Sequence, residues 1–172
     1  MTTNLAEFKL ISTGKPEFKH QAIRRKCEEA IAMVTFRPAE DLAKAAHFTL
    51  SNMRPYYQQY SVDWDEAQIE SMTQQLVNFD ILFNEKPVGV VRLSFDAEEC
   101  WLRDLQVEQH YQNRGIGAIA LAEAKRLAAE RSCKILKLRV FKVSPAVHLY
   151  KRQGFDLFSE DERFYYMSRA VG

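Results

Sequence analysis

The sequence predicts a mixed α/β domain with a mostly antiparallel sheet of six to seven strands, flanked by about four helices. From residue 33 onward, short β-branched segments and segments with helical apolar spacing follow each other irregularly. The expected order is one strand, two helices, three strands, a helix, a strand, a helix and two strands. This is not the regular alternation of a doubly wound parallel sheet. With 172 residues, of which 47% are hydrophobic, the chain suits one domain with its own core.

Residues 1–32 are predicted to form an extension outside the main domain. Apolar residues recur there at helical spacing behind Pro16, and a basic cluster spans residues 24–26. We expect a helical N-terminal extension that is either an accessory segment or an interaction arm. The main domain is expected to occupy residues 33–172.

The first elements of this domain are bounded by prolines and acidic caps. A short strand at 33–37 is stopped by Pro38, and a helix at 39–53 is expected to end before Pro55. Asp63 is the expected N-cap of a second helix, with Glu66 completing a capping box. The apolar face of that helix is expected to continue through Leu76 and Val77.

The remaining elements follow from apolar alternation and turn residues. A hairpin turn at 84–87 separates two strands. The predicted strands are 79–83, 88–95, 100–107, 135–141, 155–158 and 163–168, and the predicted helices are 116–131 and 145–153.

A glycine turn joins the strand at 100–107 to the alanine-rich helix at 116–131. Gly115 and Gly117 let the backbone turn tightly and approach a ligand closely. The unpaired amides and the dipole at a helix N-terminus favour a phosphate. The spacing fits neither a Walker A loop nor a complete dinucleotide fingerprint.

Composition narrows the class of protein. The net charge of +1 lacks the basic excess of a dedicated nucleic-acid binder. Cys27, Cys100 and Cys133 match no zinc spacing and are expected to be buried small residues, so no metal is implied. No apolar run suits a membrane span and the start lacks a signal-peptide core, so we expect a cytoplasmic protein without membrane association.

Two motifs resemble the GNAT superfamily, the GCN5-related N-acetyltransferases. The run Gln112–Gly117 fits Gln/Arg-x-x-Gly-x-Gly/Ala, the acyl-CoA pyrophosphate loop of that family. The run Pro145–Phe155 resembles a helix signature of the same family, and the resemblance covers residues 33–170. The segments Met53–Tyr57, Trp64-Asp65 and Glu162–Met167 are similar to one small bacterial subgroup.

The resemblance implies acetyl-CoA as cosubstrate, held between two splayed strands. The main chain after the first of these strands would bind the pyrophosphate, and the strand itself would pair with the pantetheine arm. The positions that correspond to cofactor contacts are Leu105, Gln106, Val107, Gln112, Asn113, Arg114, Gly115, Ile116, Gly117, Ala118 and Ser144. Ser144 stands where the subgroup commonly has Asn, which implies a modest cost in cofactor affinity. The alternative is an ordinary tight helix entry at the two glycines.

Two residues match catalytic positions of the family. Tyr150 corresponds to the family's general acid. A phenol stays protonated at neutral pH and can therefore donate a proton. Alternatively, Tyr150 is a half-buried packing residue. Asp104 corresponds to a carboxylate that acts as base or holds the amine. Alternatively, Asp104 forms a structural ion pair with Arg103 or Arg139.

Acceptor contacts are expected from the loop between the first two helices and from the closing strands. The candidates are Arg54, Tyr56, Tyr57, Trp64 and Tyr165, some of which would instead pack the loop onto the sheet. The expected activity is acetyl transfer to a primary amine, of a small molecule or peptide, by direct attack in a ternary complex. The alternative is a non-catalytic acyl-CoA-binding regulatory module. A homodimer is expected by analogy.

Overall fold

The computed structural model describes residues 33–172. The elements are β1 (Val34–Pro38), α2 (Leu42–Gln59), α3 (Glu66–Thr73), β2 (Val77–Phe83), β3 (Lys86–Asp96), β4 (Glu99–Val107), a short 3₁₀ helix (Gln109–Tyr111), α4 (Ile116–Glu130), β5 (Ile135–Phe141), α5 (Ala146–Arg152), β6 (Asp156–Glu160) and β7 (Phe164–Ala170). The predicted mixed α/β class is confirmed, and each predicted strand and helix of the main domain is present. The bounds agree within three residues except at the C-terminal ends of the first two helices.

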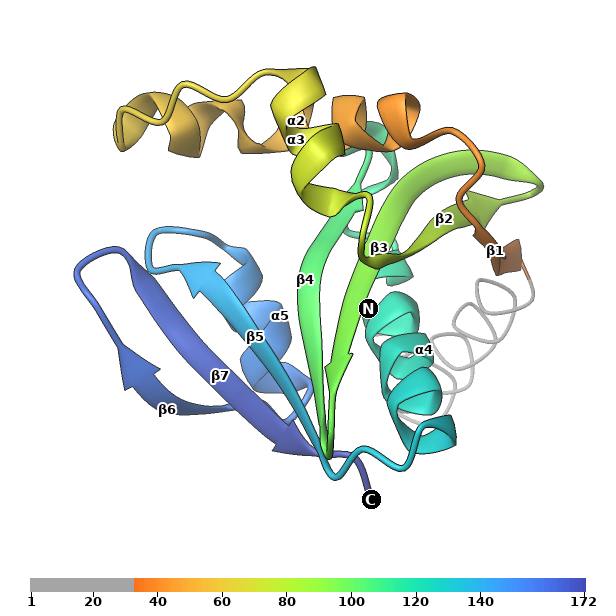
Figure 1. Ribbon diagram of the computed structural model, residues 1–172, viewed down its shortest axis with the longest axis vertical. Coiled ribbons are helices and arrows are strands. Elements are labelled where there is room, and N and C mark those ends of the chain that lie inside the picture. Colours follow the sequence, from red (N-terminus) through yellow and green to blue (C-terminus); the bar gives the residue numbers. More distant parts are fainter. Residues whose placement is uncertain (1–32) are drawn as a thin grey trace, which may run out of the picture.

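The seven strands form one sheet in the order β1-β2-β3-β4-β5-β7-β6. All neighbouring strands are antiparallel except β4 and β5, which pair in parallel only between Glu99–Leu102 and Ile135–Leu138. Figure 1 shows these two strands together at one end of the sheet and separating towards the other. The edges of both strands beyond Leu102 and Leu138 are therefore free of each other.

Helices cover the two faces of the sheet separately. α4 packs on β3, β4 and β5, where its alanine-rich face joins a large apolar core with strand residues such as Leu102 and Leu138. α2 packs on the opposite face of β3 and β4 and forms a second, smaller cluster with α3 around Ala46, Tyr57 and Ile69. Along β5, the core-facing residues alternate with Lys137 and Arg139, which lie on the α2 side.

α2 does not end at Pro55 as expected; the helix continues to Gln59 with the proline inside it. Proline removes one hydrogen bond and kinks a helix. The last turn persists because its tyrosines are held by tertiary contacts: Tyr57 is buried, and Tyr56 and Tyr60 each stack on Phe141 with ring centroids 5.3 Å and 5.0 Å apart. Packing therefore overrides the local breaker.

α3 is capped by a different pair from the one predicted. Asp65 accepts a bond from the Gln68 amide at 2.8 Å, and the Gln68 side chain accepts from the Asp65 amide at 2.9 Å. Asp63 and Glu66 do not form the box. The helix ends at Thr73, so Leu76 and Val77 are not on its face, and Val77 begins β2.

The chain from 33 to 172 contains no helix of the length and apolarity needed to span a membrane. The same part holds no group of three or more His, Cys, Asp or Glu side chains arranged for a metal ion. Cys100 and Cys133 are buried free thiols, as expected. Cys27 and the predicted helical extension at 1–32 lie outside the described residues.

Candidate active site

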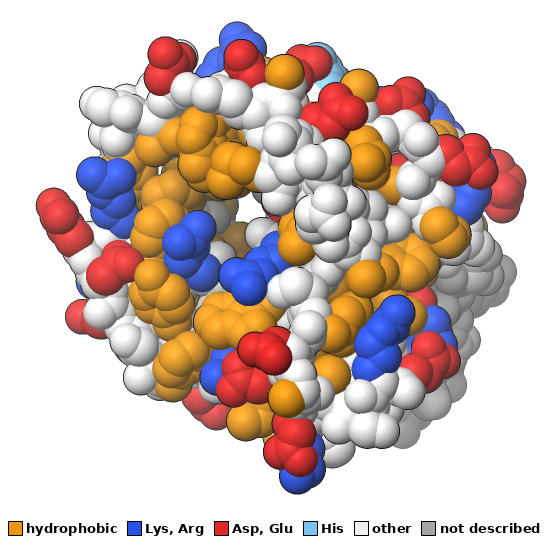
Figure 2. Space-filling model, in the orientation of Figure 1, with side chains coloured by type: hydrophobic (Ala, Val, Ile, Leu, Met, Phe, Trp, Pro, Cys, Tyr) orange, Lys and Arg blue, Asp and Glu red, His pale blue; other side chains and the backbone are white. Residues whose placement is uncertain are grey.

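A cavity of about 1040 Å³ occupies the region where β4 and β5 separate. Its walls come from both faces of the sheet: α2 and α3 on one side, the start of α4 and α5 on the other, with β7 at the rim. Figure 2 shows a hollow on this face, surrounded by hydrophobic side chains and by Lys or Arg side chains. The opening between the two strands thus connects the two faces of the sheet.

The glycine turn presents consecutive main-chain donors beside this cavity. No acceptor is found among residues 33–172 for the amides of Asn113–Gly117, whereas the Ala118 amide donates to the Gly115 carbonyl at 3.0 Å. Asn113 and Gly115 have φ of 59° and 85°, which turns the backbone sharply before α4. Within the described residues, five successive amides at the start of a 15-residue helix are thus without an acceptor, an arrangement that suits a phosphate group.

The two glycines differ in what an added side chain would meet. A Cβ at Gly115 would meet no atom within 4 Å, so only its left-handed backbone demands glycine. A Cβ at Gly117 would lie 3.0 Å from Leu149 Cδ2, so this glycine lets α4 begin close to α5. The motif thus sets both the turn and the spacing of the two helices.

Side chains of the same turn are engaged elsewhere. Gln112 donates to the Val107 carbonyl at 2.9 Å, and the Arg114 guanidinium lies 5.4 Å from the centre of the Tyr111 ring. Ile116 is buried in the core. The donors that face the cavity are therefore mainly backbone amides.

The separated part of β4 forms the floor of the cavity. Leu105, Gln106 and Val107, which were predicted to contact the cofactor, all line this cavity. The Val107 carbonyl accepts from Asn52 Nδ2 at 2.9 Å, in addition to Gln112. Side chains thus secure the strand end while its edge towards β5 stays unpaired.

Ser144 lines the cavity from the β5–α5 turn. Its hydroxyl accepts from the Ala146 amide at 3.2 Å and from the Tyr56 hydroxyl at 3.4 Å. Ser144 therefore binds the first amide of α5 and also contacts α2 across the opening.

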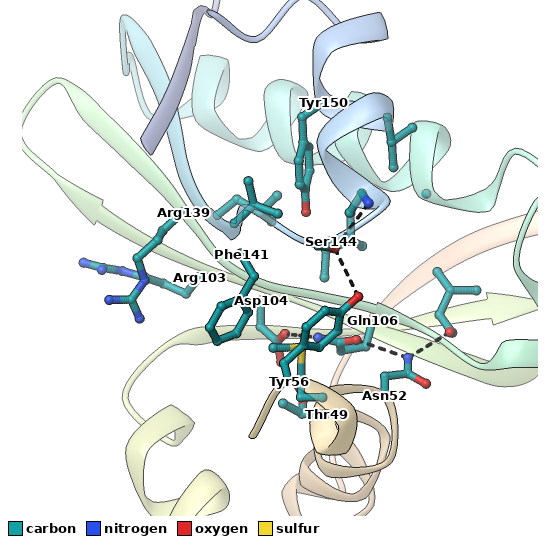
Figure 3. A pocket seen from close by; sticks show the side chains of 18 of the residues that line it. Thr49, Asn52, Tyr56, Arg103, Asp104, Gln106, Arg139, Phe141, Ser144 and Tyr150 are labelled. Carbon is teal, nitrogen blue, oxygen red and sulfur yellow. Dashed lines mark hydrogen bonds between the residues drawn. The ribbon is translucent and has the colours of Figure 1, made fainter. Parts of the chain in front are cut away.

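Tyr150 projects from α5 towards the cavity, where Figure 3 shows its hydroxyl directed at the opening. The side chain is buried, and its ring lies edge-on to Phe155 at 5.8 Å. Burial first, and then the negative charge of Asp104, raise the pKa of Tyr150 well above its usual value. The phenol therefore carries its proton throughout the neutral range.

Asp104 lies across the opening, on the α2 side of the sheet (Figure 3). Its Oδ2 accepts from Thr49 Oγ1 at 2.5 Å and from Arg92 Nη1, and its Oδ1 accepts from Gln106 Nε2 at 2.8 Å. The carboxylate does form an ion pair, but with Arg92 and not with Arg103 or Arg139. Its remaining lone pair on Oδ1 is available to the cavity that it lines.

Arg92 is fully buried behind the cavity and was not anticipated as part of the site. Its Nε donates to Asn78 Oδ1 at 2.8 Å and its Nη1 to Thr49 Oγ1 at 2.7 Å, in addition to the bond to Asp104. Nη2 has no hydrogen-bond partner in the described part of the chain. The available signal was that Arg92 is the one charged residue in the mostly apolar run at 88–95.

The predicted acceptor residues divide into two groups. Tyr56, Tyr57 and Trp64 line the cavity, whereas Arg54 and Tyr165 do not. Tyr165 packs against the core on the other face, and its neighbour Tyr166 takes the position at the rim. The lining residues that the prediction missed include Thr49, Asn52, Trp101 and Phe141.

Tyr57 is a second buried phenol close to Asp104. Burial first, and then the Asp104 charge, raise its pKa to about 12, while Arg92 acts in the opposite direction. Its ring meets Trp64 edge-on at 5.4 Å. Two protonated tyrosines thus flank the carboxylate, one from each side of the sheet.

Cys100 is fully buried on the α4 side of β4. Burial and the neighbouring Cys133 raise the pKa of its thiol to about 12. Because the thiolate is the reactive form, this position does not supply a nucleophile.

Comparison with known proteins agrees with this geometry. The sequence model of the acetyltransferase (GNAT) family matches residues 40–155. Streptothricin acetyltransferase of Streptomyces lavendulae is 30% identical over 87 residues, which are 49% of this chain and 46% of that protein. The chain therefore spans about half the length of this curated relative.

Solved structures show the same fold. The PaiA N-acetyltransferase of Thermoplasma acidophilum, solved with coenzyme A, superposes with a TM-score of 0.61 and 17% identity over 80% of this chain and 98% of that one. Nourseothricin acetyltransferase gives a TM-score of 0.54 and 25% identity, over 56% of this chain and 66% of that one. Since the family model covers well over half of the residues, the chain belongs to the acetyltransferase (GNAT) family.

Proposed function

We propose that the protein transfers an acetyl group from acetyl-CoA to a primary amine held in the cavity between β4 and β5. The observation that carries this proposal is the run of five free amides at Asn113–Gly117, placed beside the cavity and opposite a protonated tyrosine. A fold relative solved with coenzyme A supports the choice of ligand.

The residues present fit coenzyme A. The amides of Asn113–Gly117 would bind the pyrophosphate, and Arg114 adds a positive charge alongside. The free edge of Leu105–Val107 offers backbone partners to the amide groups of a pantetheine arm, much as an added strand would find them. Ser144 provides a hydroxyl where the arm would pass between β4 and β5.

Bound in this way, acetyl-CoA supplies an activated thioester. A neutral amine forms the new C–N bond as the C–S bond breaks, and Tyr150 donates its proton to the departing sulfur. The surplus proton of the amine leaves to water or to Asp104, and the phenol is reprotonated from solvent. Because the pKa of Tyr150 is raised, nearly all molecules hold the donor in its active form at neutral pH.

We assign to Asp104 the positioning of the amine. Thr49, Arg92 and Gln106 fix the carboxylate by three side-chain hydrogen bonds, so its orientation towards the cavity is defined before an acceptor arrives. A fixed acceptor of hydrogen bonds orients a nucleophile at low entropic cost. The same network explains why Thr49 and Gln106 line the site.

The alternative is a module that binds acyl-CoA and only signals its presence. Tyr150 favours an enzyme, because a pure binder needs no proton donor beside the thioester. The acceptor is a small molecule or a peptide, and streptothricin belongs in any panel because two relatives are named for it or for nourseothricin.

The test is thiol release from acetyl-CoA with a panel of free amines, peptides and streptothricin, together with calorimetric titration of coenzyme A. We expect saturable coenzyme A binding and release that depends on an added amine. Binding without release for any acceptor would support the signalling module. Failure to bind coenzyme A at all would overturn the proposal.

A further inference from the structure

The charges that line the cavity are almost all positive. The charged lining side chains are Arg103, Asp104, Arg139, Arg152 and Arg163, so four of the five are arginines. The one carboxylate is already paired with buried Arg92. A cavity of this charge repels polycations and favours a ligand that carries negative charge.

Two of these arginines, Arg103 and Arg139, directly follow the last paired residues of β4 and β5, Leu102 and Leu138, and both line the cavity. Both side chains are labelled in Figure 3. Arg103 is the extra residue of a β-bulge in β4: its neighbours Leu102 and Asp104 pair with consecutive residues of β3, and Arg103 has no partner there. The irregularity turns Arg103 to the same side as Asp104, its neighbour in the sequence.

Both guanidinium groups are held in place by neighbours. Arg103 Nε donates to Ser94 Oγ at 2.8 Å, and its guanidinium lies 5.0 Å from the centre of the Trp101 ring. The guanidinium of Arg139 lies 4.4 Å from the centre of the Phe164 ring. Stacking of this kind orients the planar group and leaves its N–H donors at the edge available to a carboxylate or phosphate.

Neither arginine has an ion-pair partner within residues 33–172, whereas nearby lysines do. Lys137, two residues before Arg139 on the same face of β5, pairs with Glu99 at 2.5 Å. Asp161 is near enough for Arg139 to add slightly to the lowering of its pKa, which is caused first by the Phe164 amide. Its carboxylate is already bonded to two amides and to the Tyr166 hydroxyl.

These arginines are also on the wrong face for the coenzyme A pyrophosphate. The free amides precede α4, which covers the opposite face of the sheet from α2. Arg152, on α5, is the lining arginine of that other side. Arg103 and Arg139 therefore face the acceptor.

We propose that the acceptor is a short amine that also carries a carboxylate or phosphate, with its anionic group held by Arg103 and Arg139 and its amine at Asp104. This assignment rests on the proposed transferase function of the same site. Since Arg103 and Asp104 are adjacent in the sequence, the anionic group and the amine of such an acceptor are separated by only a few bonds.

The experiment compares matched amines that differ in the anionic group: β-alanine with its amide, and phosphoethanolamine with ethanolamine, with spermidine as polycation. Rates are corrected for the fraction of neutral amine at the assay pH. We expect kcat/KM to favour the anionic member of at least one pair by about tenfold or more, the effect of one charge-assisted contact. The pair with the larger ratio identifies carboxylate or phosphate.

The variant Arg103→Gln/Arg139→Gln should abolish that preference by raising KM for the anionic amine, with coenzyme A affinity unchanged. Arg126→Gln is the matched control, since Arg126 lies on α4 outside the cavity and pairs with Glu123 and Glu130. Both altered residues are exposed, so the fold should be retained. Equal use of charged and neutral amines, preference for spermidine, or an unchanged ratio in the double variant would overturn the inference.

Calorimetry of the same amines with the coenzyme A-saturated protein separates the two proposals. Binding that favours the anionic amine and is lost in the double variant, without thiol release, would sustain the acceptor class and reject the transfer chemistry. Thiol release with neutral amines alone, without arginine-dependent binding, would sustain the transfer chemistry and reject the acceptor class.

Discussion

The two walls of the cavity are built in different ways. The α4 wall includes Gln112, Asn113, Gly115, Gly117 and Ala118 of the glycine turn, together with Ser144 and Tyr150. It offers backbone amides from one continuous turn and one phenol. The α2 wall, made of Thr49, Asn52, Tyr56 and Tyr57 with Asp104, offers side chains that are fixed by one another. A ligand shared by a whole family suits a wall of main chain, and a variable acceptor suits a wall of replaceable side chains.

The sharpest test of this contrast is a pair of tyrosine variants, one from each wall. Tyr150→Phe should lower kcat by about 10²- to 10⁴-fold, the usual range for loss of a general acid, without weakening coenzyme A binding. Tyr57→Phe should lower kcat by less than about tenfold, because its hydroxyl is assigned no proton transfer. Steady-state thiol release and coenzyme A titration measure both. Comparable losses in the two variants would contradict the assignment of the acid to α5.

The α2 wall depends on a buried ion pair, so removing one partner should cost stability. Asp104→Leu leaves the fully buried Arg92 without its counter-charge and should lower the free energy of unfolding by about 3–5 kcal/mol. Arg92→Met/Asp104→Leu should recover most of that loss but not the activity. Urea denaturation measures the stability of the single and double variants, and thiol release measures their turnover. An unchanged unfolding midpoint in Asp104→Leu would mean that the pair contributes nothing to the fold.

The α4 wall depends on backbone conformation, so a single methyl group should perturb it. Gly115→Ala places a Cβ where no neighbour lies within 4 Å, and the expected cost of about 1–2 kcal/mol comes from the left-handed backbone alone. Because the amides turn with the backbone, coenzyme A affinity should fall while the unfolding transition stays cooperative. Calorimetry and thermal denaturation measure the two effects. If affinity is unaffected, the turn does not position the pyrophosphate.

The smallest effect is expected from alkaline pH. The folded chain holds Tyr57 and Tyr150 with raised pKa values, about 12 for Tyr57. Below about pH 10 both folded and unfolded chains keep these protons, so stability is unaffected; above it only the unfolded chain releases them, and stability falls as pH rises. Urea midpoints between about pH 8 and 11 should decline, and less steeply in Tyr57→Phe. Identical slopes would show that the phenol titrates normally.

The contrast also explains what the sequence could predict. The α4 wall was visible because its turn, glycines and following helix are consecutive, and because Pro145–Phe155 repeats a family pattern. The fold class and the element order could also be predicted, because apolar periodicity is a pattern of residues close together in the sequence. The Arg92–Asp104 pair joins positions on two strands, and Thr49 adds a third element 43 residues away from Arg92, so no local pattern reveals their contact.

Errors arose where tertiary contacts outweighed local signals. A proline usually ends or kinks a helix, but α2 continues beyond Pro55 because Tyr56 and Tyr60 stack on Phe141. Tyr165 and Tyr166 are both aromatic, and only the pairing register decides that Tyr166, opposite Arg139, faces the rim. The pairing partner is information that composition does not contain.

The separation of β4 from β5 bears on the order of addition in the proposed reaction. The amides of residues 113–117 and Asp104 lie on opposite faces of a sheet that is open between them, so the proposed coenzyme and amine would approach the cavity from different faces. In that case neither reactant would block the other, and we expect addition in either order.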